Sequence, residues 1–128
     1  MKKIKTIVTI AIVILAISCK KEKQDKESLI GYWSGTYTYS STNKPISFLF
    51  IDNNKVRYFL GNTDTSLAVK YDATYTAVSD SVQIAITMYL AGNVYVKYLG
   101  KQNQRQIAGD VKNETIPSLS GTFIIYKR

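Results

Sequence analysis

The sequence is poor in the residue types that most catalytic and metal sites require. Its 128 residues include no histidine, one cysteine, and nine acidic side chains against 17 basic ones. Without histidine, the chain can form neither a Cys/His zinc site, nor a Ser-His-Asp triad, nor a Cys-His pair. A single cysteine can form neither an internal disulfide nor a Cys-x-x-Cys redox pair. The length suits one domain, and these absences exclude several common classes of enzyme.

Only one long apolar run is present, and it lies near the N-terminus. Residues 6–17 are apolar with an interruption at Thr9, and Lys2, Lys3 and Lys5 precede them. The run is about half as long as the ~20 residues that cross a bilayer as a helix. A basic segment followed by a short apolar run is typical of a signal peptide.

The only cysteine follows this run directly. Residues 15–19 (LAISC) resemble the lipobox of bacterial lipoproteins, although the leucine lies one position further from the cysteine than the consensus prefers. The resemblance implies cleavage after Ser18, a diacylglycerol thioether on Cys19, and fatty acylation, for example by palmitate, of the new N-terminus. Several acyl chains on one residue would give stable anchoring. Lys20 follows in place of the aspartate associated with inner-membrane retention, which points to the outer membrane, at its periplasmic face or at the cell surface. The alternative is an incidental thiol after an ordinary signal peptide.

We therefore divide the chain into a signal peptide (1–18), a lipidated cysteine with a polar tether (19–28) and one domain (29–128). Removal of three signal-peptide lysines leaves 14 basic against nine acidic residues, a net charge of +5. Residues 20–27 carry four basic and three acidic side chains and no apolar one. An arm that binds nucleic acid would be basic without those acids. We expect a solvated tether, attachment to the membrane through the lipid, and no nucleic-acid partner.

Beyond residue 28 the hydrophobic pattern has a period of two, which is typical of half-buried strands. Between residues 66 and 77 every second side chain is apolar or aromatic, and clusters of Gly, Asn, Asp and Ser separate this run from similar ones. Eight strands about 12 residues apart predict an all-β barrel or sandwich. Short connections favour an up-and-down antiparallel order, and closure would remove exposed edges. The predicted strands span residues 32–40, 45–51, 54–60, 66–77, 81–90, 93–100, 104–112 and 119–127.

Two features of the domain resemble the lipocalin-like (calycin) barrels and small bacterial lipocalin-like lipoproteins. Gly31-Tyr32-Trp33 opens the first strand, and Lys127 and Arg128 follow the last. The resemblance implies that Trp33 plugs one barrel end and that Arg128, or Lys127, packs across it. The long first loop and C-terminal helix of full lipocalins are missing, so an avidin-sized barrel fits best. An immunoglobulin-like sandwich is the rival, but it would place tryptophan in the third strand between paired cysteines.

All fifteen aromatic residues lie after residue 31. If the apolar face of each strand points inward, several tyrosines share the interior with Phe48, Phe50 and Phe123. A buried tyrosine hydroxyl normally has a hydrogen-bond partner. The interior is therefore either a filled core, with hydroxyl–hydroxyl bonds and trapped water, or a cavity for a small amphipathic ligand. The candidate cavity residues are Tyr37, Tyr58, Tyr71, Tyr75 and Tyr98.

A non-catalytic binding lipoprotein is the function that the sequence favours. Most acids lie in turns, and Asp110 with Glu114 could serve glycoside chemistry only if both faced a cleft. No phosphate loop, calcium loop or nucleophile elbow is present, so we expect no cofactor, no metal and no enzymatic activity. The alternative is a structural or protein-interaction lipoprotein, such as an accessory subunit, an inhibitor or an immunity-type partner. Its contact surface would use the outward-facing Tyr32, Tyr89, Tyr95 and Tyr126.

One short motif suggests a modification. Asp80-Ser81-Val82 resembles the Asp-Ser/Thr-apolar sequence on which some Gram-negative bacteria O-glycosylate exported proteins. Its place in a turn between two strands would expose the Ser81 hydroxyl. Ordinary turn chemistry, in which Asp and Ser bond to nearby backbone, explains the same residues without a sugar.

Overall fold

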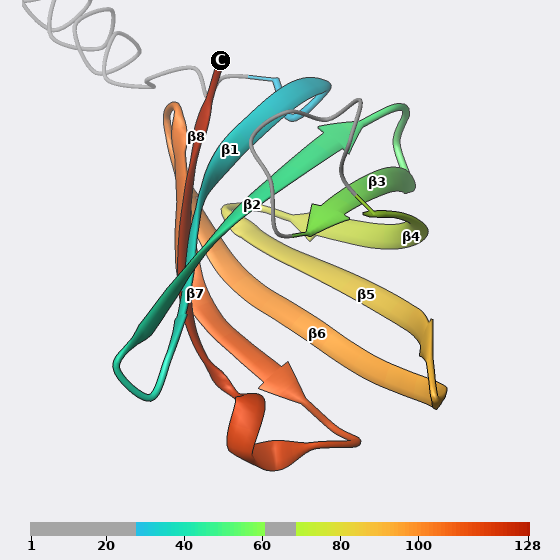
Figure 1. Ribbon diagram of the computed structural model, residues 1–128. Coiled ribbons are helices and arrows are strands. Elements are labelled where there is room, and N and C mark those ends of the chain that lie inside the picture. The colour runs from blue at the N-terminus through green and yellow to red at the C-terminus, as the bar shows by residue number, and fades with distance from the viewer. Residues whose placement is uncertain (1–27, 61–68) are drawn as a thin grey trace, which may run out of the picture.

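The computed structural model describes residues 28–60 and 69–128. They form one antiparallel sheet of eight strands, in which each strand pairs with its neighbours in sequence (Figure 1). The sheet closes into a barrel because the last strand pairs with the first. The elements are β1 (Gly31–Tyr39), β2 (Thr42–Phe50), β3 (Lys55–Leu60), β4 (Val69–Val78), β5 (Ser81–Leu90), β6 (Gly92–Asn103), β7 (Gln106–Asn113), the 3-10 helix η1 (Pro117–Leu119) and β8 (Gly121–Lys127).

The predicted up-and-down, all-β barrel is confirmed, and closure rules out the rival sandwich. Among the described bounds, most lie within two residues of the predicted ones, and one bound in each of two strands differs by three residues. β2 begins at Thr42, three residues earlier than expected, because Ser40 adopts a φ of 47° and lets a tight turn connect it to β1. β6 continues to Asn103, three residues beyond the predicted end of this strand at Gly100. The start of the strand expected at residues 66–77 lies outside the described residues.

Alternation along each strand separates an apolar interior from a polar exterior. In β6, for example, Val94, Val96 and Tyr98 are buried while the residues between them face solvent. The inward-facing residues of the eight strands form one continuous core inside the barrel. Neighbouring residues are both buried at a few positions, such as Trp33 and Ser34 of β1 and Tyr58 and Phe59 of β3. Its largest fully buried side chains are Trp33, Tyr58, Tyr98, Phe48, Phe50, Ile46, Ile84, Ile107 and Ile125.

Glycines allow the barrel to close tightly at the seam between β1 and β8. A Cβ atom on Gly35 would lie 1.9 Å from the carbonyl oxygen of Ile124, and one on Gly121 would lie 1.9 Å from that of Thr38. No side chain fits at either distance, so both strands need glycine where their backbones cross closely. A glycine on each of the two strands therefore allows β8 to pair closely with β1.

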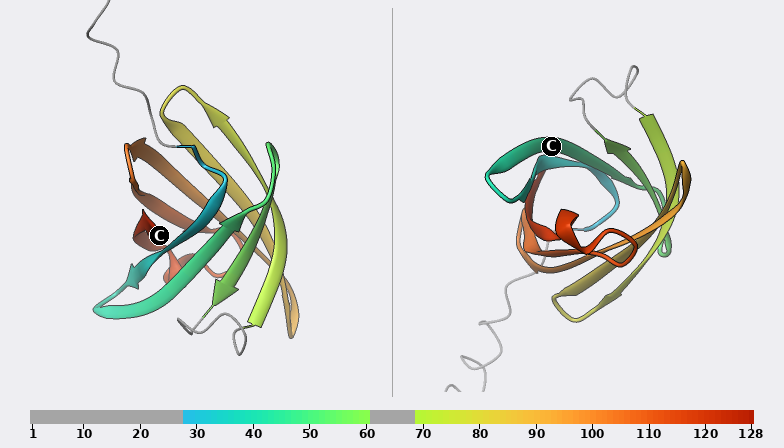
Figure 2. Two further views of the ribbon diagram at one scale, coloured as in Figure 1. Left: turned by 90° about the horizontal axis from the view of Figure 1, so that it is seen from above. Right: turned by 60° about the horizontal axis from the view of Figure 1, so that its bottom comes forward.

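The two ends of the barrel differ in construction. At the end that holds both termini of the described domain, Trp33 is fully buried and its indole N–H donates to the Leu29 carbonyl at 2.8 Å. The ammonium of Lys127 donates to the Ser28 carbonyl at 2.6 Å, which ties the entering chain to the last strand. At the opposite end lie the β1–β2 and β5–β6 hairpins and the connection that contains η1 (Figures 1 and 2). The Trp33 end is therefore closed by side chains and by the entering chain.

We expect Trp33→Ala to destabilise the domain by about 3–5 kcal/mol, because it removes a large aromatic side chain from a fully packed site. Urea unfolding followed by tyrosine fluorescence measures the change in the free energy of unfolding. Tyr126→Ala, which truncates an exposed aromatic on β8, is the matched control and should cost about 0.5 kcal/mol or less. Equal effects of the two substitutions would contradict the assignment of Trp33 to the core.

Candidate binding cavity

A cavity of about 120 Å³ opens at the end of the barrel opposite Trp33. Six strands and the β7–β8 connection contribute to its wall, and half of the twelve lining residues are buried hydrophobic ones. The lining residues are Tyr37, Tyr39, Lys44, Tyr58, Leu60, Met88, Val94, Val96, Tyr98, Asn113, Ile116 and Leu119.

Strand register places the wall residues opposite one another. Met88 at the end of β5 pairs with Val94 at the start of β6, and Tyr37 of β1 pairs with Lys44 of β2. Because paired residues project from the same face of a sheet, each of these pairs faces the interior. Lys44 lies close to the hairpin, so its side chain reaches solvent at the mouth.

The β7–β8 connection crosses the open end of the barrel, as the right-hand view of Figure 2 shows. Asn113, the last residue of β7, holds it there: its Oδ1 accepts the backbone N–H of Thr115 at 3.1 Å and that of Ile116 at 2.7 Å. The Ser120 hydroxyl accepts the backbone N–H of Asn113 at 3.0 Å and ties the end of the connection to its start. These bonds position Ile116 at the mouth of the cavity.

The floor of the cavity contains a buried tyrosine pair. The hydroxyls of Tyr58 on β3 and Tyr98 on β6 are 2.8 Å apart and hydrogen-bonded. Phe48 packs against both rings, with centroid distances of 5.0 Å to Tyr58 and 5.2 Å to Tyr98. Burial raises the pKa of Tyr58 and of Tyr98 well above the ordinary value for tyrosine, because desolvation penalises the phenolate. Both hydroxyls therefore stay neutral through the physiological range of pH.

Tyr37 lies between the floor and the mouth. Its ring meets that of Tyr98 edge to face at 6.3 Å and that of Tyr39 at 5.1 Å. Burial raises the pKa of its hydroxyl, and the neighbouring Tyr39 adds to the effect. The wall between floor and mouth is thus aromatic on the β1 side.

Three of the five tyrosines predicted from the sequence line the cavity: Tyr37, Tyr58 and Tyr98. Tyr71 is half-buried against the Tyr58 ring at 6.4 Å but does not line it. Tyr75 lies towards the Trp33 end of β4, where its hydroxyl donates to the Asp52 carbonyl. Its ring meets that of Phe50 edge to face at 4.8 Å. Alternation fixes which face a tyrosine takes, whereas its height along the barrel depends on register between strands.

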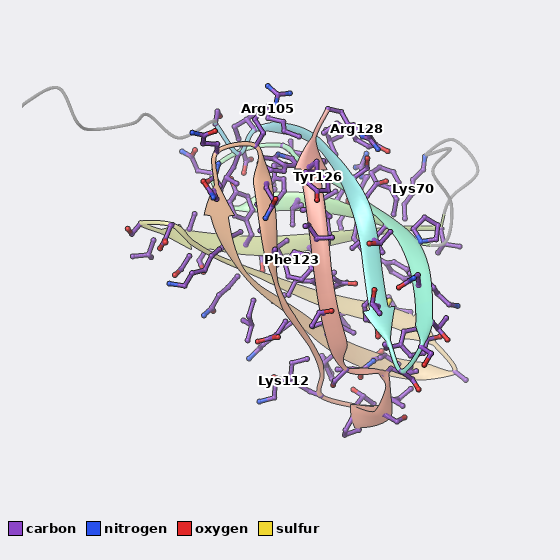
Figure 3. The ribbon with its side chains drawn as sticks, turned by 90° about the vertical axis from the view of Figure 1, so that its left-hand side faces the viewer. Lys70, Arg105, Lys112, Phe123, Tyr126 and Arg128 are labelled. Atoms are coloured by element: carbon purple, nitrogen blue, oxygen red, sulfur yellow. The ribbon has the colours of Figure 1, made fainter. Side chains whose placement is uncertain are left out.

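The other predicted site residues lie as follows. Ser18 and Cys19 are outside the described residues. Lys127 is the register partner of Trp33. The exposed Arg128 donates from its guanidinium to the Ser34 hydroxyl and from its backbone N–H to the Tyr32 carbonyl, so its contacts are with β1. Figure 3 places Arg128 and Arg105 at the same end of the barrel, the one that carries the C-terminus.

Ser81 is the first residue of β5 and is partly buried. The preceding Ser79 and Asp80 form the expected two-residue turn, in which Ser79 has a φ of 55°. The Asp80 carboxylate lies 3.9 Å from the Lys101 ammonium. The turn is as the sequence predicted, and O-glycosylation of Ser81 stays a prediction.

Sequence reasoning missed Lys44 and Asn113. The sequence predicts a connection at residues 41–44 and a loop at residues 113–118, so neither side chain falls on the face of a predicted strand. Lys44 has the same parity as Ile46 and Phe48, which is the one signal that could have placed it on the inward face of β2. Asn113 likewise continues the alternation of Ile107 and Val111.

The acidic residues do not gather into a catalytic or metal-binding cluster within the described segments. Asp110 is exposed on β7, and Glu114 pairs with Lys97 at 3.1 Å on the outside of the barrel. In residues 28–60 and 69–128 no three potential metal ligands of the His, Cys, Asp or Glu type lie together. Nor does this part of the chain contain a helix long and apolar enough to span a membrane.

A second depression, of about 550 Å³, lies on the outer surface across β3 and β4 and is more open to solvent. Arg57 and Asp72, which border it, already form an ion pair at 2.9 Å. Most of the other bordering residues are exposed, and its polar groups do not converge on a point. The smaller cavity inside the barrel is therefore the better candidate site, because its walls are buried and preformed.

The chain matches no protein-family model, no curated protein and no solved structure. Relatives therefore offer no guide to a ligand. The residues of the cavity itself, and the chemistry that they permit, are the basis on which a function can be proposed.

We expect the Tyr58–Tyr98 pair to make the protein lose stability in alkali. Below about pH 10 the pair is neutral in both the folded and the unfolded chain and has no effect on the pH dependence. Above that pH the unfolded tyrosines ionise while the folded pair, with its raised pKa, does not. The free energy of unfolding should then fall by about 1.4 kcal/mol per pH unit for each hydroxyl.

Urea unfolding at several pH values between about 9 and 11.5 measures this slope. The double variant Tyr58→Phe/Tyr98→Phe removes both hydroxyls and leaves neither without its partner, so it should fold and show a shallower alkaline slope. An unchanged slope in the double variant would show that the pair is not protected from ionisation.

Proposed function

We propose that this protein is a lipid-anchored lipoprotein of the cell envelope, held at the outer membrane. Its small lipocalin-like barrel binds a small amphipathic ligand without catalysis. The observation that carries the proposal is the cavity of about 120 Å³ opposite Trp33, which combines apolar walls with a few polar groups. Preformed apolar pockets with a few well-placed polar groups are typical of small-molecule sites.

The size of the cavity limits what it can hold. Sites for drug-sized ligands usually measure about 300–1,000 Å³, whereas an apolar cavity of about 150 Å³ is enough for benzene. Aromatic and aliphatic side chains of the core fill the rest of the barrel. A ligand of about six carbon atoms, or one end of a longer molecule, is therefore the size that fits.

The position of the cavity suits a protein anchored through its N-terminus. Ser28, where the described domain begins, contacts Lys127 at the Trp33 end, and the cavity opens at the other end. A tether that joins the domain at Ser28 leaves the mouth unobstructed. This arrangement supports the proposal that the anchored barrel presents its cavity at the end far from the attachment point.

The outer face favours a second candidate function, which is contact with another envelope protein. Tyr89 is 72% exposed and Tyr95 is 48% exposed, and both lie on the outside of the β5–β6 hairpin. Exposed tyrosines on one hairpin are typical of protein interfaces. Tyr126 lies on β8, and Tyr32 donates its hydroxyl to Ser47 at 3.0 Å, so the four tyrosines do not share one strand pair.

Substitution of Cys19 by alanine tests the anchor. Cys19→Ala removes the only thiol that can carry the diacylglycerol, so we expect unprocessed precursor or soluble protein and no incorporation of radioactive palmitate. Ser41→Ala, at the β1–β2 turn, is a control that should still be labelled. A Cys19→Ala protein that is labelled and fractionates with membranes would contradict the lipoprotein assignment.

A methionine label tests the cavity. The chain has two methionines, Met1 and Met88, and removal of residues 1–18 would leave Met88 alone. Met88 lines the cavity, so the NMR signal of its ¹³C-labelled methyl group reports occupancy directly. We expect hexan-1-ol to cause a saturable shift of this signal in the mature protein in phosphatidylcholine nanodiscs.

A pair of matched variants distinguishes hexanol bound in the cavity from hexanol in the surrounding lipid or on the protein surface. Val94→Phe places a ring beside Met88 inside the cavity and should weaken hexanol binding by about tenfold or more. Val78→Phe makes the same change at a residue 73% exposed on β4 and should leave binding unchanged. Equal titrations of the two variants, or no saturable shift in the unsubstituted protein, would overturn the proposed ligand binding.

A further inference from the structure

Two of the polar groups that line the cavity, the ammonium of Lys44 and the NH₂ group of Asn113, can only donate hydrogen bonds. Among the described residues that line it there is no aspartate or glutamate, while lysine, asparagine and tyrosine side chains are present. What each of these groups can still offer to a ligand follows from the bonds that it already makes within the protein.

Lys44 supplies a cation at the mouth. It faces the interior side of β2 opposite Tyr37, and its side chain is exposed at the rim. No described carboxylate lies within ion-pair distance of its ammonium group. The ammonium is thus available to a ligand that enters the cavity.

Asn113 supplies a neutral donor. It is 4% exposed, and its Oδ1 accepts two backbone N–H groups of the β7–β8 connection. Because those bonds require the oxygen, the orientation of the amide is fixed, and its NH₂ group is the part left over. Within the described part of the chain this NH₂ group has no hydrogen-bond partner. It is not enclosed, since every fully enclosed side-chain nitrogen or oxygen there has a partner.

The tyrosine pair supplies a third donor at the floor. A hydrogen bond between two hydroxyls uses only one of their two protons. Tyr58 and Tyr98 make no other side-chain hydrogen bond to the described residues. Whichever hydroxyl accepts, its own proton is not used in this bond, and both tyrosines line the cavity.

We propose that the cavity selects amphipathic ligands whose head group is an anion, of the carboxylate type, and that Lys44 and the Asn113 amide hold this head group at the mouth. The inference rests on the ligand binding proposed above and specifies its chemistry. With no carboxylate among the described lining residues, an ammonium and an N–H donor complement a carboxylate and disfavour a cation. The apolar body of the ligand then packs against Leu60, Met88 and Val96.

Three six-carbon probes that differ only in their head group test the selection. Hexanoate, hexan-1-ol and hexylammonium are titrated against the Met88 methyl signal in the mature protein in phosphatidylcholine nanodiscs. We expect hexanoate to bind more tightly than hexanol, and hexylammonium to bind most weakly. The preference for hexanoate should shrink between about 20 mM and about 500 mM salt, because the exposed Lys44 ammonium is screened.

Two substitutions assign the preference to its residues. Lys44→Gln should weaken hexanoate binding by about two- to fivefold, the range of a solvent-exposed ion pair, and leave hexanol binding unchanged. Lys112→Gln removes the same charge from the outer face of β7, where Figure 3 shows the side chain pointing away from the barrel, and should not alter either affinity.

Asn113→Asp tests the contribution of the Asn113 amide and should have a larger effect than Lys44→Gln. It keeps an oxygen for the N–H groups of Thr115 and Ile116 and replaces the free NH₂ group with a negatively charged oxygen. Hexanoate binding should weaken by about tenfold or more because like charges would meet in the cavity. Binding of hexanol, which tests the proposed function separately, should persist.

The outcomes distinguish the two proposals. Saturable hexanol binding without a preference for hexanoate, or with a preference that survives both substitutions, would overturn the anionic head group and leave the binding cavity in place. Failure of all three probes to shift the Met88 signal would overturn the binding function and this inference with it.

Discussion

The pairing of β8 with β1 is the constraint on which the rest of the structure depends. An open sheet of this composition would expose two edges with unpaired backbone groups, and closure satisfies them. The close backbone crossings at Gly35 and Gly121 allow that pairing at the tightest part of the seam. Once the sheet is closed, alternation leaves each side chain with only two choices, the lumen or the solvent. The composition of the core and of the cavity therefore depends on which side chains face the lumen.

A closed eight-stranded barrel has limited space inside, and this protein fills most of it with aromatic rings and aliphatic side chains. The interior is tightly packed at Gly100, where a Cβ atom would lie 2.8 Å from the ring of Phe123. Buried tyrosine hydroxyls also require hydrogen-bond partners, and the bond between Tyr58 and Tyr98 meets part of this requirement. Because that pair spans from β3 to β6 across the lumen, it forms a floor. The cavity is the space that remains between this floor and the β7–β8 connection.

Much of the fold could be predicted from the sequence because a period of two and turn-forming clusters are local signals. They give the number of strands, their antiparallel order and the inward face of residues such as Trp33, Tyr58 and Tyr98. The height of a side chain along the barrel is not local, since it depends on register across several strand pairs. For that reason the sequence did not distinguish Tyr98, which lines the cavity, from Tyr75, which lies towards the closed end.

The polar residues of the cavity were missed for a related reason, which concerns the ends of strands. Lys44 and Asn113 occupy positions where a strand meets its connection, and polarity there is ordinary turn chemistry in sequence. In the structure the Asn113 oxygen holds the β7–β8 connection over the mouth, and its NH₂ group makes no hydrogen bond to the described residues. The same side chain therefore limits the size of the opening and offers a donor beside it. The bonds that its oxygen makes explain why a polar residue ends β7, and the NH₂ group of the same amide is the donor on which the proposed preference for an anion depends.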